Sequence, residues 1–240
     1  MVTDGSAGGT AQGTAGPLGR SSFESFLGAL LVVPVVEIDC ADDAVPLARA
    51  LLDAGLPCAE ITFRTAAAAH AIAAIAAEVP EVRVGAGTVL NVAQAEAALA
   101  AGAGFLVAPC FDPAVVAFAL ERDVPIVPGV CTPTEVGLAL ARGLSVVKFF
   151  PAEAAGGVRY LKALAAPFGG VRFVPTGGIS ADNLAAYLAI DQVIACGGSG
   201  MVKKQLIADR EFDTIGRLAA EAREIAAAAR PVPGSRGDAR

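Results

Sequence analysis

The chain has 240 residues, a formal net charge of −6, a pI of about 4.9 and a mean hydropathy of +0.60. The acidic balance and the absence of a basic stripe argue against nucleic acid and anionic membranes as partners. No window reaches the ~18 unbroken apolar residues of a membrane span. The first apolar run has no basic segment before it and no cleavage pattern after it, so a cytoplasmic protein is expected.

The two ends of the chain differ in composition from the part between them. Residues 1–20 are rich in Gly, Ala and Thr without hydrophobic periodicity, and residues 231–240 are similar. Such composition is typical of disordered tails. One domain is therefore expected over residues 21–230, a length that suits a single α/β barrel. An extra helix over 21–30 is predicted to precede the first strand.

Eight short apolar runs, rich in β-branched residues, predict strands along this domain. They cover residues 31–38, 58–64, 82–89, 105–109, 125–130, 145–150, 171–178 and 192–198. Ala/Leu-rich stretches with helical spacing separate them, and strands that alternate with helices pair in parallel. Eight such units indicate a closed (β/α)8 TIM barrel. An open doubly wound sheet is the competing fold, but VVEIDCADDA, which ends the first strand, lacks the expected GxGxxG.

Helix boundaries fit the same alternation. The candidate N-caps near strand ends are Asp42, Asn91, Asp112 and Thr132 or Thr134. The glycines placed where helices should stop are Gly55, Gly102 and Gly143.

The segment VVKFFPAE, residues 146–153, places Lys148 inside an apolar run. Burying a cation is costly unless it is paired or neutralised. The other three lysines of the chain, Lys162, Lys203 and Lys204, lie in amphipathic or polar surroundings. Desolvation disfavours the ammonium form, and a neutral amine is a nucleophile. Lys148 is therefore the candidate nucleophile.

Other polar side chains fall at the predicted carboxyl ends of the strands, where the active site of such a barrel lies. Glu60, Thr62 and Arg64 alternate along the second strand and share one face. Further strand ends supply Thr88, Pro109, Phe150, Thr176 and Ser199. Purely structural interpretations of these residues stay open. Glu60 and Arg64 are also compatible with an ion pair at a strand end, and the threonines with strand-end caps.

The functional interpretation joins these residues into one reaction. A lysine amine attacks a ketone to give an iminium, an electron sink that allows an adjacent C–C bond to break. Each step moves a proton, and Glu60 is the carboxylate placed to act as general acid/base. The planar guanidinium of Arg64 can donate two parallel hydrogen bonds to a carboxylate of the substrate. A substrate that is both ketone and carboxylate is a 2-oxo acid, and the predicted reaction is a metal-independent aldol cleavage.

Glycine pairs end the last two predicted strands, in TGGIS and CGGSG. Loops at these positions of barrels often bind phosphate through backbone amides. The residues concerned are Gly177, Gly178, Gly197, Gly198 and Ser199. We expect a phosphate site there.

The histidine and cysteine counts bear on metals and cofactors. The single histidine, His70, nearly excludes a His-based triad or a multi-His zinc site. The five cysteines have no CxxC spacing and are expected to be small buried hydrophobes. No metal and no cofactor are expected.

The motifs EITFRT, VGAGTVL, VPGVCTPTE, KFFPAE and PTGGIS, in this order, resemble the family of 2-keto-3-deoxy-6-phosphogluconate (KDPG) and 4-hydroxy-2-oxoglutarate (KHG) aldolases. The resemblance covers about residues 24–225. It implies a TIM barrel that cleaves a phosphorylated 2-oxo acid to pyruvate and glyceraldehyde 3-phosphate through a Schiff base, in the Entner–Doudoroff pathway. It also implies a homotrimer without metal, and a second activity on 4-hydroxy-2-oxoglutarate, which would give pyruvate and glyoxylate.

The resemblance also implies residue roles. Lys148 matches the Schiff-base lysine and Glu60 the general acid/base. Arg64 and Thr88 match the residues that hold the pyruvate carboxylate. The positions that match the pocket lining and the phosphate turns are Pro109, Phe150, Thr176, Gly177, Gly178, Gly197, Gly198 and Ser199.

Two departures from the family pattern and three alternatives stay open. APC stands where the family usually has SP and a small residue, and Gly200 stands where it often has tryptophan. The alternatives are an aldolase for the 6-phosphogalactonate epimer, a phosphate-binding barrel isomerase or epimerase, and a catalytically inactive barrel. Arg64 and FFPAE favour the gluconate enzyme. The single histidine opposes the isomerase, and the presence of Lys148 and Glu60 opposes an inactive barrel.

Overall fold

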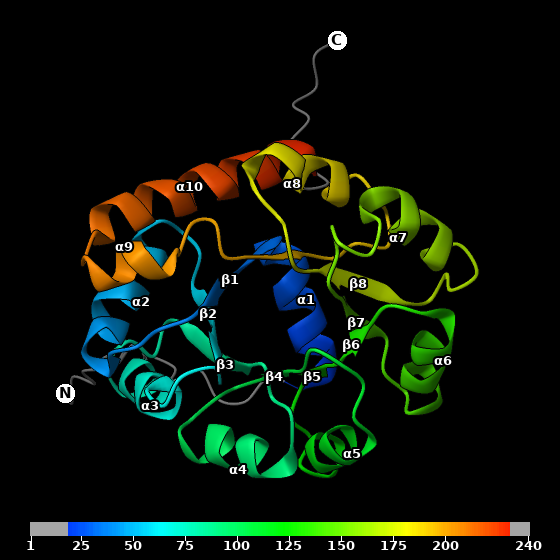
Figure 1. Cartoon of the computed structure of the whole chain (residues 1–240), viewed down its shortest axis with the longest axis horizontal. Coiled ribbons are helices and arrows are strands. Elements are labelled where there is room, and N and C mark those ends of the chain that lie inside the picture. The colour runs from blue at the N-terminus through cyan, green and yellow to red at the C-terminus, as the bar shows by residue number, and fades with distance from the viewer. Residues whose placement is uncertain (1–18, 231–240) are drawn as a thin grey trace, which may run out of the picture.

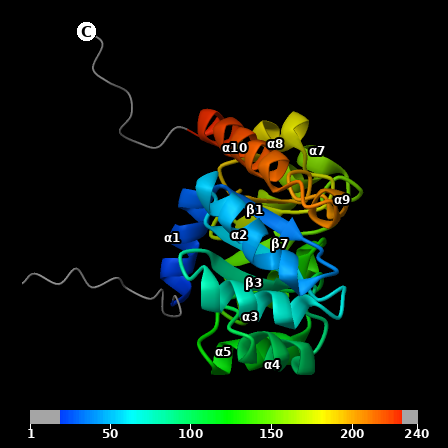
Figure 2. The same ribbon diagram turned by 90° about the vertical axis from the view of Figure 1, so that its left-hand side faces the viewer.

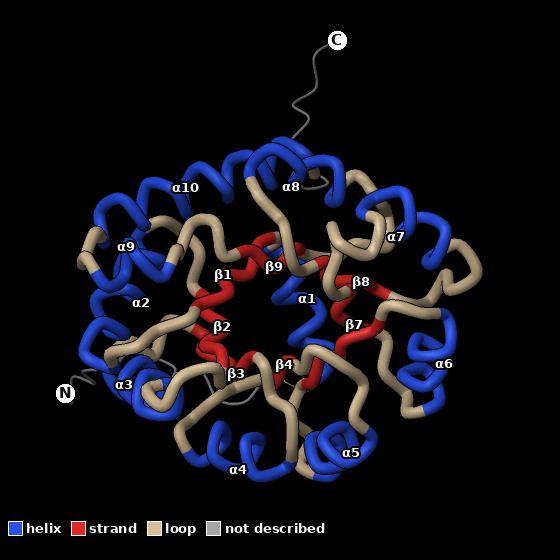
Figure 3. Tube along the Cα trace, viewed as in Figure 1, coloured by secondary structure: helices blue, strands red, loops and turns tan. Residues whose placement is uncertain are grey.

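The structure, a computed structural model, describes residues 19–230. The predicted tails, 1–20 and 231–240, lie outside the described residues except at Gly19 and Arg20, where the first helix begins. Between these limits the chain forms an inner ring of strands surrounded by helices (Figure 3). No helix within residues 19–230 has the combined length and apolar character needed to cross a membrane.

Strands and helices alternate along the chain (Figure 1). The strands are β1 (Val32–Val36), β2 (Cys58–Thr62), β3 (Arg83–Gly87), β4 (Leu106–Val107), β5 (Ile126–Val127), β6 (Gly129–Val130), β7 (Val146–Phe149), β8 (Arg172–Pro175) and β9 (Cys196–Gly198). The helices are α1 (Arg20–Leu30), η1 (Ala41–Asp43), α2 (Ala44–Asp53), α3 (Ala68–Glu78), α4 (Val92–Ala100), α5 (Pro113–Glu121), α6 (Pro133–Ala141), α7 (Gly157–Ala165), α8 (Ala181–Leu188), α9 (Lys204–Ala208) and α10 (Phe212–Ala229).

The strands pair in parallel and close on themselves. One sheet runs in the order β5-β4-β3-β2-β1-β9 and a second in the order β6-β7-β8. Two isolated parallel bridges, Phe173 with Val193 and Thr176 with Gly197, join β8 to the β9 segment. The predicted (β/α)8 barrel is therefore confirmed, with its strands in sequential order.

The fifth predicted strand, residues 125–130, differs from expectation because it consists of two short strands, β5 and β6. Pro128 lies between them and has no N–H to donate to a ladder. β5 pairs with β4 and β6 pairs with β7, so this segment is where the two sheets meet.

Most predicted helix boundaries are confirmed. Asn91, Asp112 and Thr132 accept backbone N–H groups at the starts of α4, α5 and α6. The prediction of Asp42 as an N-cap is wrong, because this residue lies inside the 3-10 turn η1 and Asp43 precedes α2.

The three glycines predicted to end helices adopt left-handed backbone conformations, in which a side chain would be strained. Their φ values are +76° at Gly55, +95° at Gly102 and +70° at Gly143.

The extra helix α1 lies across one end of the barrel (Figure 2). Phe23 and Leu27 on this helix are buried, and the ring of Phe23 lies 5.0 Å from that of Phe105. Apolar side chains thus fill this end, and access to the barrel interior is left to the opposite end, where the strands terminate.

Candidate active site

A cavity of about 430 Å³ lies at the carboxyl ends of the strands. Every residue predicted for the site lines it except Glu60, which lies directly below in the barrel interior. The lining residues that bear on function are Glu37, Thr62, Arg64, Thr88, Pro109, Lys148, Phe150, Thr176, Gly177, Gly178, Gly197, Gly198, Ser199, Lys203 and Lys204. The sequence prediction missed Glu37, Lys203 and Lys204.

Lys148 projects from the middle of β7. Its backbone is fixed by pairing with Gly129 of β6 and Val174 of β8. The side chain is buried, with Nζ 3.5 Å from Oε1 of Glu60 and 5.1 Å from the centre of the Phe150 ring. The amine therefore faces one carboxylate and one aromatic wall.

Glu60 lies in β2, and Gly87 of β3 makes room for its side chain. A Cβ on Gly87 would collide with Oε1 of Glu60, and a Cβ on Gly85 would collide with the ring of Phe105. Glycine at position 87 therefore leaves the space that the Glu60 side chain occupies, and glycine at position 85 leaves the space that the Phe105 ring occupies. Gly87 is thus explained by packing against the candidate catalytic carboxylate, and Gly85 by packing in the barrel interior.

The interpretation of Glu60 and Arg64 as an ion pair with each other is wrong. Glu60 contacts Lys148, whereas Nη1 of Arg64 lies 3.1 Å from Oε2 of Glu37. β2 ends at Thr62, whose hydroxyl donates to the carbonyl of Val36 in the barrel wall. Arg64 follows the strand and lies at the rim of the cavity.

Thr88 directly follows β3 and has a φ of +55°. A β-branched residue in the left-handed region is a real outlier, and such outliers concentrate at functional sites. Pro109 and Phe150, both half-buried, also line the cavity. The strained backbone of Thr88, together with its place in the cavity lining, indicates that the end of β3 serves a purpose other than packing.

The glycine turns form the other end of the cavity. Gly177 and Gly178 have φ values of +99° and +82°, so their conformation favours glycine. Gly197 and Gly198 belong to β9 and are buried, while Ser199 is exposed. A Cβ on Gly197 would collide with Oγ1 of Thr176, so this glycine is also required for packing.

The segment after KFFP supports these turns. The amides of Ala152 and Glu153 donate to the carbonyls of Thr176 and Gly177 at 2.8 and 3.0 Å. The Glu153 side chain accepts a hydrogen bond from Tyr187 and packs where a side chain on Gly178 would lie. Burial, together with the Glu153 carboxylate, raises the pKa of Tyr187, which keeps this hydroxyl a donor.

The cysteines are only in part the buried hydrophobes that were predicted. Cys58 and Cys196 are buried, and burial raises the pKa of both thiols. Cys40 and Cys110 are exposed and Cys131 is half-buried, which corrects the prediction. Among residues 19–230, no three His, Cys, Asp or Glu side chains are grouped as metal ligands would be.

The arrangement combines a buried amine, a carboxylate within reach of it, a cation at one rim and glycine turns at the other. An amine and an acid/base buried in the barrel interior are suited to Schiff-base chemistry. A guanidinium at one end and backbone amides at the other are suited to two separate anionic groups.

Comparison with known proteins agrees with this chemistry. Residues 23–218 match the family model described as KDPG and KHG aldolase. The chain is 54% identical to the 2-dehydro-3-deoxy-phosphogluconate aldolase of Treponema pallidum, with 81% of this chain and 92% of that protein covered. It is 45% identical to the KHG/KDPG aldolase of Escherichia coli K12, with 85% and 96% covered.

A solved structure extends the similarity to the fold. The KDPG aldolase of Legionella pneumophila, captured with pyruvate as a covalent carbinolamine, superposes with a TM-score of 0.79 at 36% identity. The match covers 82% of this chain and 97% of that one. The chain belongs to the KDPG and KHG aldolase family.

Proposed function

We propose that this protein is a class I aldolase that cleaves 2-dehydro-3-deoxy-6-phosphogluconate to pyruvate and glyceraldehyde 3-phosphate. The observation that carries the proposal is the buried Lys148 with Nζ 3.5 Å from the carboxylate of Glu60. A buried ion pair is weak evidence for stability, since apolar residues often do as well. Its position in a barrel interior that opens onto a cavity favours a catalytic role.

The proposed reaction begins when Nζ of Lys148 attacks C2 of the substrate to give a carbinolamine. Loss of water then gives an iminium. Glu60 removes the proton of the C4 hydroxyl, the C3–C4 bond breaks, and its electron pair moves into the iminium to form an enamine while the aldehyde leaves. Protonation at C3 and hydrolysis release pyruvate and restore the lysine. The carbinolamine captured in the Legionella pneumophila enzyme supports the first step.

The two anionic ends of the substrate have separate proposed sites. Arg64 and Thr88, at one side of the cavity, bind the carboxylate beside the ketone, while Pro109, Phe150 and Thr176 form the walls. The phosphate binds between the turn at Gly177 and Gly178 and the end of β9, where Gly197, Gly198 and Ser199 lie. Binding energy from the phosphate then helps to place the ketone over Lys148.

A substrate panel tests this proposal. Pyruvate release is measured from 2-dehydro-3-deoxy-6-phosphogluconate, from its 6-phosphogalactonate epimer and from 4-hydroxy-2-oxoglutarate, each with and without EDTA. We expect the highest kcat/KM for the gluconate compound, measurable cleavage of 4-hydroxy-2-oxoglutarate, and no effect of EDTA. A preference for the galactonate epimer would overturn the substrate assignment. Activity lost with EDTA and restored by zinc or magnesium would overturn the Schiff-base mechanism.

We further propose that the enzyme works as a homotrimer in the cytoplasm, as a step of the Entner–Doudoroff pathway. The family membership supports this assembly and role. With a chain of 23.9 kDa, light scattering should give about 72 kDa, three times the chain mass. A mass near that of the single chain would contradict the trimer.

A further inference from the structure

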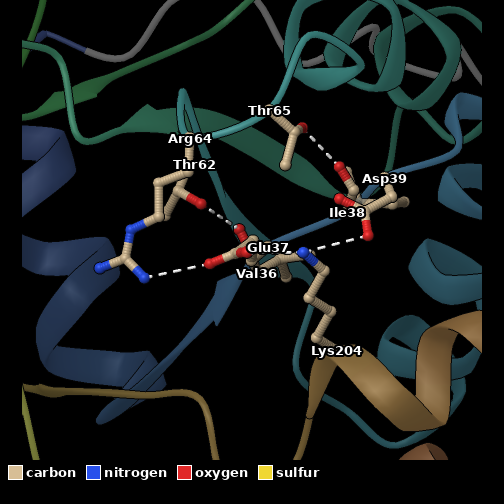
Figure 4. Close-up of polar contacts among 8 residues, drawn as sticks. All are labelled: Val36, Glu37, Ile38, Asp39, Thr62, Arg64, Thr65 and Lys204. Carbon is tan, nitrogen blue, oxygen red and sulfur yellow. Dashed lines mark hydrogen bonds and ion pairs between the residues drawn. The ribbon is translucent and has the colours of Figure 1, made fainter.

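A chain of charged side chains at the rim of the cavity joins the segments that follow β1 and β2 to the start of α9 (Figure 4). Nη1 of Arg64 contacts Oε2 of Glu37 at 3.1 Å, and Nζ of Lys204 contacts Oε1 of the same carboxylate at 2.9 Å. We call Arg64, Glu37 and Lys204 the rim bridge. Arg64 follows β2 and Lys204 begins α9, just after the proposed phosphate turn. The bridge therefore connects the two proposed anion-binding ends of the site.

The backbone around Glu37 is held on both sides. The hydroxyl of Thr62 donates to the carbonyl of Val36 at 2.8 Å, and that of Thr65 donates to the carbonyl of Ile38 at 2.5 Å. Figure 4 shows these two hydrogen bonds, which hold the residues before and after Glu37. The carboxylate of Glu37 is thus presented to Arg64 from a fixed position.

Both partners keep Glu37 ionised. The hydrogen bond from Lys204, and next that from Arg64, lower the pKa of the Glu37 carboxyl below its ordinary value. Glu37, and then Asp39, raise the pKa of Lys204. The bridge therefore carries its full set of charges at neutral pH.

Arg64 uses one edge of its fork in this contact. Its guanidinium binds Glu37 through Nη1, and the side chain is 54% exposed. An exposed arginine samples many rotamers, and immobilising such a side chain on binding weakens affinity by about two- to tenfold. Because Glu37 already holds the guanidinium of Arg64, part of that loss of affinity is avoided. The remaining N–H groups of Arg64 can then bind a second carboxylate, that of the substrate.

We propose that Glu37 is a positioning residue, which holds Arg64 in the orientation that receives the substrate carboxylate and links it through Lys204 to the phosphate end. This inference rests on the proposed function, in which Arg64 binds that carboxylate. The opposite possibility is that Glu37 occupies Arg64 and competes with the substrate. The two possibilities predict opposite effects of Glu37 on substrate affinity, because positioning tightens substrate binding and competition weakens it.

The experiment measures the pyruvate concentration that gives half-maximal borohydride inactivation, together with KM and kcat for cleavage. Glu37→Gln keeps the shape of the side chain and removes its charge. We expect the half-maximal pyruvate concentration and KM to rise about three- to tenfold, with kcat within about twofold, because Lys148 and Glu60 are untouched.

Asp39→Asn is the matched control. Asp39 also contacts Lys204, at 3.0 Å, whereas Arg64 pairs with Glu37. The substitution thus removes a carboxylate from the same cluster without removing the partner of Arg64. It should leave the half-maximal pyruvate concentration, KM and kcat unchanged.

A double-mutant cycle shows whether Glu37 acts through Arg64. In an Arg64→Ala background, Glu37→Gln should cause no further rise in the half-maximal pyruvate concentration. An equal rise in both backgrounds, a fall in Glu37→Gln alone, or no change in Glu37→Gln alone would each overturn the inference. Failure of the proposed function looks different: the wild-type protein would form no adduct, or Arg64→Ala by itself would leave the half-maximal concentration unchanged.

Discussion

Two sets of opposite charges lie within the same site, one in the barrel interior and one at its rim. The side chains of Lys148 and Glu60 are 6% and 4% exposed, whereas those of Arg64, Glu37 and Lys204 are 54%, 31% and 48% exposed. The interior pair has one contact at 3.5 Å, and the rim bridge has shorter contacts of 3.1 and 2.9 Å. The lengths of these contacts therefore do not show which of the two sets matters more for function.

The surroundings decide what each set does. Charges in the interior are shielded from solvent, so each depends on the other as its partner. Charges at the rim are screened by solvent, and their pairing contributes little to stability. The interior pair is thus suited to making and breaking bonds, and the rim bridge to orienting a ligand. Substitutions in and around the two sets test this division.

Among variants that keep Lys148, Glu60→Gln should have the strongest effect. The amide keeps the shape of the side chain but cannot take a proton, and general acid/base catalysis contributes about 10²–10⁴-fold in rate. Turnover should fall by that factor, while the circular dichroism spectrum stays that of the wild type. A fall of less than about threefold would make the pair structural rather than catalytic.

Gly198→Val tests the phosphate end. A Cβ at this position would meet Met201 Cε at 3.5 Å and the Ile179 carbonyl at 3.8 Å, both ordinary contacts, so the first added carbon fits the fold. The branched side chain should still obstruct a phosphate. We expect kcat/KM for the phosphorylated substrate to fall at least about tenfold, or ~1.4 kcal/mol.

The activity of Gly198→Val on 4-hydroxy-2-oxoglutarate, which carries no phosphate, is the internal control and should change far less. Equal losses on both substrates would show that β9 supports the barrel instead of the phosphate.

Thr88→Gly separates stability from binding. The left-handed φ of Thr88 costs about 1–2 kcal/mol for a residue with a Cβ, while glycine in the unfolded chain costs roughly 0.5–1 kcal/mol in entropy. The variant should therefore be equally stable or up to about 1.5 kcal/mol more stable in urea unfolding, yet have a higher KM. Lower stability with an unchanged KM would mean that the hydroxyl serves the fold and not the substrate.

The pH dependence of the rim bridge should be the weakest of these effects. Because Lys204 and Arg64 lower the pKa of Glu37, this carboxylate binds its proton less readily in the folded than in the unfolded state. Its contribution to stability is fully present above the ordinary value of 4.5 and is lost as pH falls through the lowered folded pKa.

Urea unfolding of wild type and Glu37→Gln at several pH values measures this contribution. The difference between the two proteins should be small and constant from about pH 6 to 8, and should shrink below about pH 4.5. A difference that grows with acidity would contradict the proposed charge state of the bridge.

The interior pair could be predicted from the sequence, and the rim bridge could not. A lysine within an apolar run is conspicuous, and period-two alternation along the second strand points Glu60 into the barrel interior with it. Glu37 has the sequence context of an apolar strand end, and its partner Lys204 lies 167 positions away in the chain. Only the closed ring brings those two together, because β9 pairs with β1.

Two features of the backbone could also not be predicted from the sequence pattern. Pro128 divides the fifth strand, although its flanks VPIV and GV have strand composition. The strain at Thr88 has no signature in residue type, since β-branched residues ordinarily avoid the left-handed region.

Borohydride trapping with pyruvate, followed by peptide mass spectrometry, shows which amine reacts. Reduction of the iminium should add one pyruvate-derived group to Lys148, and Lys148→Ala should abolish both this adduct and turnover. Lys162, Lys203 and Lys204 are internal controls and should remain unmodified. An adduct on one of these three lysines, or an adduct that persists in Lys148→Ala, would contradict the assignment of Lys148 as the nucleophile.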